Sequence, residues 1–306
     1  MNEKVLLVVD MEGCCGIYDL KAREECKKKM ELEVDFIISV LNKLGHNDIS
    51  LLDCHNDGTT LGEYCMNKGI PFINHLWSLN KAVKYSCAFL VGFHGKADTD
   101  GYFPHTIRQD IKSMSLGKEV VGEVALVINW LAFFNIPVVY ISGDQTIEHE
   151  LRHYQGVFCV TKSKGTYESN LEEKTTQIEQ SIILSLNCPR MVRYVDQQIR
   201  IDLRNPNYCV FIPREEFTCK ENAIYFEDTV SLVQNLQLFC SYLNIAARYH
   251  SLRIGRLVDK LRQINCELLH QDKRAQKMLL MNNMHELTDD DFIYLTQLTY
   301  SLKGKS

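Results

Sequence analysis

Four short apolar segments in the first half of the chain lead directly into acidic residues or histidines. They cover residues 5–9, 49–53, 87–93 and 138–142, and the polar residues at their ends are Asp10 with Glu12, Asp53 with His55, His94, and Asp144. Apolar runs of this length are typical of buried strands. In an open α/β sheet, ligands bind outside the carboxyl ends of the strands. The sequence therefore predicts one polar site at one edge of a mostly parallel sheet.

An amphipathic helix joins the first two of these strands. Residues 23–44 carry apolar side chains at helical spacing, among them Met30 and Ile37, and Gly45 follows as a C-cap. Further helices are expected at residues 118–134, 145–154 (capped by Asp144) and 170–184 (capped by Asn170), and a further strand at residues 157–161. We therefore expect an α/β fold with a mostly parallel sheet flanked by helices.

The alternation of strands and helices stops near Asn187. Beyond it the pattern indicates strands at residues 192–203 and 209–212, a helix at residues 228–247, and helical segments at residues 251–269 and from residue 288 onward. We expect three parts: an α/β domain over residues 1–187 that carries the polar site, a smaller α+β second domain over residues 188–249, and a helical C-terminal extension over residues 250–306. Packing or a subunit interface is the expected role of the extension.

The composition narrows the functional class. The 306 residues carry a net charge of −5, which gives no electrostatic footprint for nucleic acid. Asp10 interrupts the first apolar stretch before a signal peptide could be completed, and no apolar run is long enough to span a bilayer. The twelve cysteines contain no CxxC pair, which favours reduced thiols over a disulfide framework. We expect a cytoplasmic protein that binds neither nucleic acid nor membrane.

Two residues outside the strand ends could add to the site. Glu123 lies on an apolar helix, where an unpaired carboxylate would be costly to bury. It therefore either pairs with a distant basic residue or points into the polar site. His105 lies in a loop rich in glycine and aspartate, which suits a catalytic group, although a lone loop histidine is more often a surface residue.

Together these residues form a mixed set of nitrogen and oxygen ligands, made up of Asp10, Glu12, His55, His94 and Glu123. Such a set suits Zn²⁺, Mn²⁺, Fe²⁺ or Co²⁺. Five ligands exceed the three that one catalytic zinc needs, whereas two ions sharing a bridging carboxylate would use all five. This arrangement points to metal-assisted hydrolysis. Asp53 is expected to orient the His55 imidazole.

The chain resembles the D-aminopeptidases of the DppA type, the M55 metallopeptidase family, over about the first 185 residues. The resemblance rests on six blocks in the family's order and close to its spacing: Val-Asp-Met-Glu-Gly (9–13), Asp-Cys-His (53–55), Gly-Phe-His-Gly-Lys-Ala (92–97), Pro-His-Thr (104–106), Val-Gly-Glu-Val (121–124) and Pro-Val-Val-Tyr-Ile-Ser-Gly-Asp (137–144).

The resemblance implies two zinc ions per subunit, bridged by Asp10. It assigns Glu12 and His94 to one ion, His55 and Glu123 to the other, and the catalytic role to His105. It also implies removal of an N-terminal D-residue from short peptides such as D-Ala-D-Ala, and assembly into a ring-shaped homo-oligomer.

The chain departs from the family pattern around these positions. Val127 stands where an Asn is usual, Gln145 replaces the second Asp of a Gly-Asp-Asp block, and Thr166-Tyr167 replaces a Ser-Arg pair after Lys162. The ligand positions all survive, so the departures preserve the hydrolytic chemistry and leave the substrate open.

We therefore expect a binuclear zinc-dependent aminopeptidase or amidohydrolase that acts by attack of a metal-bridging water, with His105 as catalytic residue. One alternative is a non-catalytic or differently specific ring-forming metalloprotein of the same fold. Another is a binuclear phosphohydrolase, for which the loops offer only Lys96, Arg108 and Lys112 as phosphate-binding groups.

Overall fold

The computed structural model describes residues 3–151, 154–164, 169–214, 217–220 and 223–263, with single positions at 274, 294 and 297. The chain groups into two compact units, Met1–Asp202 with Ile224–Gln237, and Leu203–Ala223 with Leu238–Ser306. The domain boundaries expected after residues 187 and 249 do not coincide with this grouping, and they stay a prediction about parts that fold independently.

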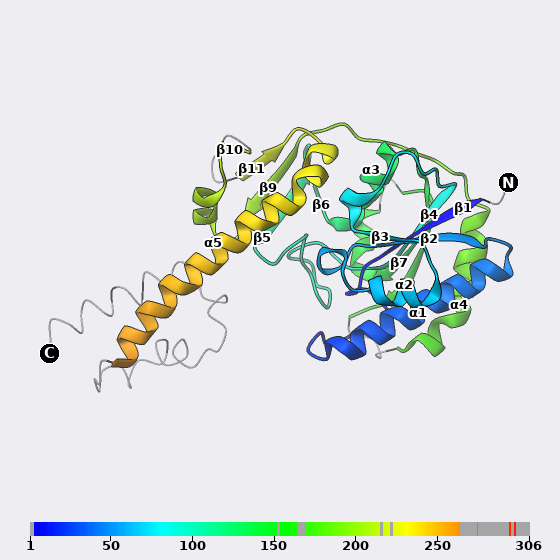
Figure 1. Ribbon diagram of the computed structural model, residues 1–306, viewed down its shortest axis with the longest axis horizontal. Helices are drawn as coiled ribbons and strands as arrows, with labels where there is room; N and C mark the ends of the chain where they lie inside the picture. The colour runs from blue at the N-terminus through cyan, green and yellow to red at the C-terminus, as the bar shows by residue number, and fades with distance from the viewer. Residues whose placement is uncertain are drawn as a thin grey trace. The chain divides into compact units, whose positions relative to one another are not determined.

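A six-stranded sheet forms the centre of the first unit, and all its neighbouring strands are parallel (Figure 1). Its order is β3-β2-β1-β4-β7-β8, from β1 (Lys4–Val9), β2 (Asp48–Asp53), β3 (Phe72–Asn74), β4 (Cys87–Phe93), β7 (Val138–Asp144) and β8 (Val157–Lys162). The five strands predicted for this sheet are confirmed. The edge strand β3 was missed, because three residues are too few to show a period.

Helices cover both faces of this sheet, which confirms the predicted α/β class. α1 (Arg23–Lys43) and α4 (Leu171–Leu186) lie together on one face, and α3 (Glu123–Phe133) lies on the other (Figure 1). The connections contain α2 (Gly62–Lys68) and the short 3-10 helices η1 (Asn56–Gly58), η2 (Leu76–Ser78) and η3 (Gln145–Glu150). The helix expected at residues 145–154 is present only as η3, with the predicted cap on Asp144.

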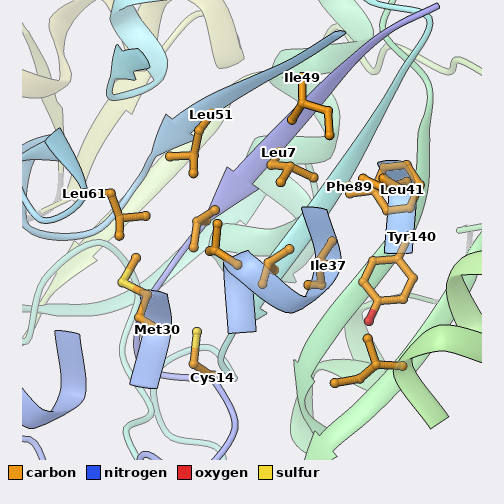
Figure 2. Packing of buried hydrophobic residues seen from close by; sticks show 14 of the residues in the cluster. Leu7, Cys14, Met30, Ile37, Leu41, Ile49, Leu51, Leu61, Phe89 and Tyr140 are labelled. Carbon is orange, nitrogen blue, oxygen red and sulfur yellow. The ribbon is translucent and has the colours of Figure 1, made fainter. Parts of the chain in front are cut away.

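The core that fixes α1 to the sheet is fully buried. Figure 2 shows it packed from Leu7, Leu51 and Phe89 of the strands and Met30, Ile37 and Leu41 of the helix. Complete burial of one such side chain contributes roughly 1.5–3 kcal/mol. The helix ends as predicted at Gly45, whose φ is +90°, and the N–H of His46 donates to the carbonyl of Leu41 at 2.9 Å.

The helix predicted from residue 118 begins later. Residues 111–121 instead form the antiparallel hairpin of β5 (Ile111–Leu116) and β6 (Glu119–Val121), in which Leu116 pairs with Glu119. Gly117 makes the two-residue turn possible with φ +62°. α3 therefore starts at Glu123, which changes the setting of this residue from a helix interior to a helix N-terminus.

The C-terminal part corrects three further expectations. The strand expected at residues 192–203 is shorter, as β9 (Ile199–Leu203). The strand expected at residues 209–212 is wrong, because these residues form the last part and the C-cap of a 3-10 helix, η4 (Pro206–Phe211), which Asn205 caps at its start. The helices expected at residues 228–247 and 251–269 are one helix, α5 (Thr229–Gln263). No glycine or proline interrupts residues 229–254, so nothing breaks it there. Residues 264–269 and the pattern from residue 288 lie outside the described ranges.

In the first unit, β11 (Ala223–Phe226), β9, β5 and β6 form a second sheet in that order. β10 (Thr218–Lys220) belongs to the second unit. Among the described helices, none combines the length and the apolar composition that crossing a bilayer requires.

Candidate metal centre

The order of the six-stranded sheet reverses between β1 and β4, which makes their carboxyl ends the topological switch point where open α/β sheets bind ligands. β1 leads to Asp10 and Glu12, and β4 leads to His94. β2, on the other side of β1, leads to His55. These four residues therefore emerge at one edge of the sheet, where the sequence placed them.

Two more predicted residues reach this edge from other elements. Glu123 is the first residue of α3, and His105 lies in the connection after β4. His105 Nε2 is 3.7 Å from Glu123 Oε1, and its ring stacks on that of His94 with centroids 4.1 Å apart. The structure thus brings together all six predicted residues, namely Asp10, Glu12, His55, His94, His105 and Glu123.

The closest contacts pair Glu12 with His55 and Glu123 with His94. Glu12 Oε2 lies 3.0 Å from His55 Nδ1, and Glu123 Oε1 lies 3.4 Å from His94 Nε2. Asp10 lies between the two pairs, with Oδ1 3.7 Å from His55 Nδ1 and Oδ2 3.5 Å from His94 Nε2. The central place of Asp10 suits a bridging ligand. Glu12 also forms a group with Asp10 and His94 in which the ligand atoms lie within 4.8 Å of one another, and the resemblance assigns these three residues to one ion.

Residues 10–17, here called the ligand loop, close tightly against the end of β4. The N–H of Gly13 donates to Gly92 O at 2.7 Å, and a Cβ on Gly13 would lie 1.9 Å from Phe93 O. Gly92 has φ +74°, and a Cβ there would lie 2.3 Å from Asp10 O. Only glycine permits this approach, which sets Asp10 beside His94.

Backbone carbonyls orient two of the imidazoles. His94 Nδ1 lies 2.9 Å from Gly95 O, and His105 Nδ1 lies 3.0 Å from Phe103 O. A carbonyl oxygen can only accept, so each Nδ1 carries a proton. In the neutral ring, Nε2 then presents its lone pair to the centre, as metal-ligating histidines require.

Glu123 is held by the segment that carries His105. Residues 102–108 are here called the His105 loop, and in it the N–H of Ile107 donates to Glu123 Oε1 at 2.6 Å. Ile107 has φ +64°, a left-handed conformation that is rare for a β-branched residue. The position of Glu123 at the start of α3 further favours its negative charge, because helix N-termini are electropositive.

Bound protons offset the negative charge of the carboxylates that converge here. Burial, followed by the charge of Glu12, raises the pKa of Asp10 to about 7. Burial disfavours a charged His55 ring, but hydrogen bonds to Asp10 and Glu12 raise its pKa to about 11. Burial likewise disfavours ionised Glu123, but the imidazole of His94, 3.4 Å away, lowers its pKa to about 2. A bound cation would take over the role of these protons and release them.

The donor set fits zinc. Asp10 Oδ2 and His94 Nε2 are buried, and they have no hydrogen-bond partner among the residues that the structure describes. Buried polar atoms are rarely left without a partner. Two ligand atoms held at about 2.1 Å by a tetrahedral ion lie roughly 3.4 Å apart. The contacts of Asp10, Glu12, His55, His94 and Glu123 span 3.0 to 3.7 Å, which matches that spacing.

Two aspartates at strand ends accept hydrogen bonds from backbone N–H groups and are not among the proposed ligands. Asp53 was expected to orient the His55 ring, but its carboxylate accepts the backbone N–H of His55 at 3.0 Å and those of Thr60 and Leu61 at 2.7 and 2.8 Å. Asp144 caps η3 and accepts the N–H of Tyr102 at 3.3 Å. Both residues shape the loops around the centre.

Two of the positions that depart from the family pattern fall on described elements. Val127 is buried on α3, and Gln145 is the first residue of η3. Thr166 and Tyr167 lie outside the part of the chain that the structure describes.

Two buried charged residues below the ligand loop had no assigned role in the sequence analysis. Glu33 of α1 accepts the N–H of Cys15 at 2.6 Å, and Lys162 at the end of β8 donates to Glu12 O at 2.5 Å. Burial raises the pKa of Glu33 to about 7 and lowers that of Lys162 to about 8. For Glu33 a signal existed, because a charged residue three positions after Met30 falls on the apolar face of its helix.

Comparison with solved structures supports the fold. The Zn-dependent D-aminopeptidase DppA from Bacillus subtilis, a self-compartmentalizing protease, is similar with a TM-score of 0.67 and 17% identity. The match covers 80% of this chain and 98% of that chain. It shows that the two chains share a fold.

Comparison of sequences adds a relative and a family. A D-aminopeptidase of Bacillus subtilis (strain 168) is 21% identical over 159 residues, which are 48% of this chain and 58% of the relative. The chain thus aligns with less than two thirds of that relative. The family model described as D-aminopeptidase, Peptidase M55, matches residues 3–193, and these include every residue of the centre. The chain belongs to the Peptidase M55 family of D-aminopeptidases.

Proposed function

We propose that this protein is a binuclear zinc-dependent aminopeptidase that cleaves short peptides with an N-terminal D-residue. The observation that carries the proposal is the meeting of three carboxylates and three imidazoles at the switch point, with two buried ligand atoms left without partners. Membership of the D-aminopeptidase family supports the class of substrate. The name of the similar structure, a Zn-dependent enzyme, supports the metal.

The distances suggest how the ligands are shared. We assign Asp10, Glu12 and His94 to one ion, because their ligand atoms lie within 4.8 Å of one another. We assign His55 and Glu123 to the other ion, with Asp10 shared between the two. This keeps the distribution implied by the resemblance, and the close contacts of Glu12 with His55 and of Glu123 with His94 then join ligands of different ions.

The proposed reaction gives separate roles to the metal ions and to His105. Two zinc ions, when bound, supply a water of lowered pKa and polarise the scissile carbonyl. His105 has its Nδ1 proton engaged by Phe103 O, so Nε2 is the atom available to the substrate. From there the imidazolium can stabilise the developing oxyanion or pass a proton to the leaving amine. The ring of His105 stacks on that of His94, which keeps it beside the proposed ligands.

The phosphohydrolase alternative finds less support. Arg108 is paired with Asp110 at 2.7 Å, and Lys112 is exposed on β5. The self-compartmentalizing character of the similar structure favours a homo-oligomer for this chain too, and we propose a ring.

Chelation and reconstitution test the function. We expect a strong chelator to abolish hydrolysis of D-Ala-D-Ala, zinc readdition to restore it, and L-Ala-L-Ala to be a poorer substrate. A generic phosphate ester serves as the matched control and should stay intact. Hydrolysis of the dipeptide that persists after the metal is removed contradicts the proposal, and cleavage of the ester alone favours the phosphohydrolase.

A further inference from the structure

One lysine lies buried beneath the metal centre and contacts both loops that build it. Lys162 ends β8, and only 1% of its surface is exposed. Its ammonium group is therefore removed from water, and the surrounding groups must compensate for its charge. The groups in contact with it come from the ligand loop and its neighbour Tyr18 on one side and from the His105 loop on the other. The carboxylates of Asp144 and Glu33 add favourable charge.

Toward the ligand loop, Lys162 makes two hydrogen bonds to backbone carbonyls. Its Nζ donates to Glu12 O at 2.5 Å and also to Ile17 O. These two carbonyls lie near the two ends of the loop, so one ammonium group ties its start to its end. Glu12 is itself one of the proposed zinc ligands, and its carbonyl is fixed by this bond.

Toward the His105 loop, the same Nζ faces aromatic rings. It lies 5.2 Å from the ring centroid of Tyr102, 4.8 Å from that of Phe103 and 5.3 Å from that of Tyr18. Contacts of this length are cation–π interactions. Phe103 also provides the carbonyl that accepts the Nδ1 proton of His105. The ammonium group therefore contacts the residue that orients the catalytic imidazole.

We infer that Lys162 is a positioning residue that sets the ligand loop and the His105 loop in one fixed relation, holding Glu12 for the metal and His105 for the substrate. The inference rests on the proposed function, because it requires that the centre binds zinc and that His105 acts in turnover. It goes further in predicting that one side chain controls both metal affinity and turnover.

Zinc affinity, measured by competition with a chromogenic chelator, is the first test. Replacement of a group that orients a ligand costs 10–100-fold in metal affinity, and we expect a loss of this size, about 10–100-fold, for Lys162→Met. Lys29→Met is the matched control, because Lys29 donates to Gly16 O of the same loop at 3.0 Å. Lys29 pairs with Glu25, and its replacement should leave zinc affinity within about twofold.

A second variant separates the two contacts of the lysine. Phe103→Leu removes a ring from the ammonium group but leaves the bonds to the ligand loop. We expect its kcat to fall roughly tenfold or more, as small misplacements of catalytic groups do, at unchanged zinc affinity. Ile182→Ala, a buried change on α4, is the control for lost stability and should affect neither quantity.

The outcomes are distinct. If the wild-type protein binds no zinc, the proposed function fails before any variant is compared. If wild type binds zinc and Lys162→Met binds it equally well, the inference is wrong while the proposed function stands. If Lys162→Met does not fold, the Phe103→Leu variant provides the test. An unchanged kcat of Phe103→Leu overturns the inference. A lowered kcat together with full zinc affinity supports it.

Discussion

The two loops of the metal centre are built in opposite ways. In the ligand loop, every residue except Gly16 is buried, and groups from three elements of the sheet and its helices fix the backbone: Gly92 of β4, Glu33 of α1, and Thr161 and Lys162 of β8. The His105 loop is half-buried apart from Thr106, and one of its residues, Ile107, has a strained backbone. The difference teaches that the ligands of the ligand loop lie in a rigid, buried backbone, whereas His105 and the hydrogen bond that holds Glu123 depend on a strained segment.

The largest effect is expected at the centre of the ligand loop. Asp10→Asn removes the carboxylate between the two proposed ion positions, and we expect zinc content to fall and hydrolysis to drop at least roughly a thousandfold. Elemental analysis and a dipeptide assay measure the two effects. Asp144→Asn is the matched control, because Asp144 also follows a strand but caps η3. Retention of two zinc ions by Asp10→Asn would show that the ligand loop is not the metal frame.

A smaller but selective effect is expected in the His105 loop. His105→Gln should lower kcat about 10²–10⁴-fold, the usual contribution of general acid–base catalysis, at unchanged zinc content. Elemental analysis beside steady-state kinetics separates the two quantities. His105, His94 and Glu123 have ligand atoms within 4.8 Å of one another. If His105→Gln loses zinc in proportion to its activity, His105 is a metal ligand, and the two loops do not differ in their roles.

The free energy of unfolding should depend on pH through Glu33, which holds the backbone of the ligand loop. Burial raises the pKa of Glu33 from 4.5 to about 7, so between these values the folded protein binds one proton more than the unfolded chain. The contribution of the Glu33 proton to the free energy of unfolding is fully present below pH 4.5 and is lost as the pH rises through 7. We expect the wild-type free energy of unfolding to fall by about 3 kcal/mol relative to Glu33→Gln over this window.

Denaturant unfolding of both proteins at several pH values measures this difference, and contributions that they share cancel. A difference that stays constant between pH 4.5 and 8 would mean that the Glu33 proton is not coupled to folding.

The smallest effect concerns the strain at Ile107. Glycine is usually less stable than alanine at a given position, but alanine is penalised where φ is positive. Both replacements remove the same side-chain contacts, so Ile107→Gly should be more stable than Ile107→Ala by about 1 kcal/mol. Thermal or denaturant unfolding of the pair measures the sign. Alanine being the more stable variant would show that the His105 loop carries no backbone strain.

The sequence was most informative where chemistry and periodicity coincided. Asp10 and His94 could be found because each follows an apolar strand, and parallel strands deliver their carboxyl ends to one edge. Glu123 was found for a partly wrong reason, since it starts α3 rather than lying inside a longer helix. The hairpin before it escaped prediction because the apolar residues 120, 121 and 124 also fit a helical pattern.

The support of the centre could not be predicted, because it depends on contacts between distant segments. Nothing near Lys162 in the sequence indicates that its ammonium group meets Glu12 O and the ring of Phe103. The positive φ of Ile107 also has no local signal, because the residue type disfavours it. Such features follow from the assembled tertiary structure.

The parallel pairing of β1 with β4 has a consequence for biosynthesis. β2 and β3 are made between these two strands, so Asp10 and Glu12 leave the ribosome long before His94 and Glu123. Distant pairing of this kind forms late in folding. A site that needs Asp10 together with His94 can therefore be completed only after β1 and β4 have paired.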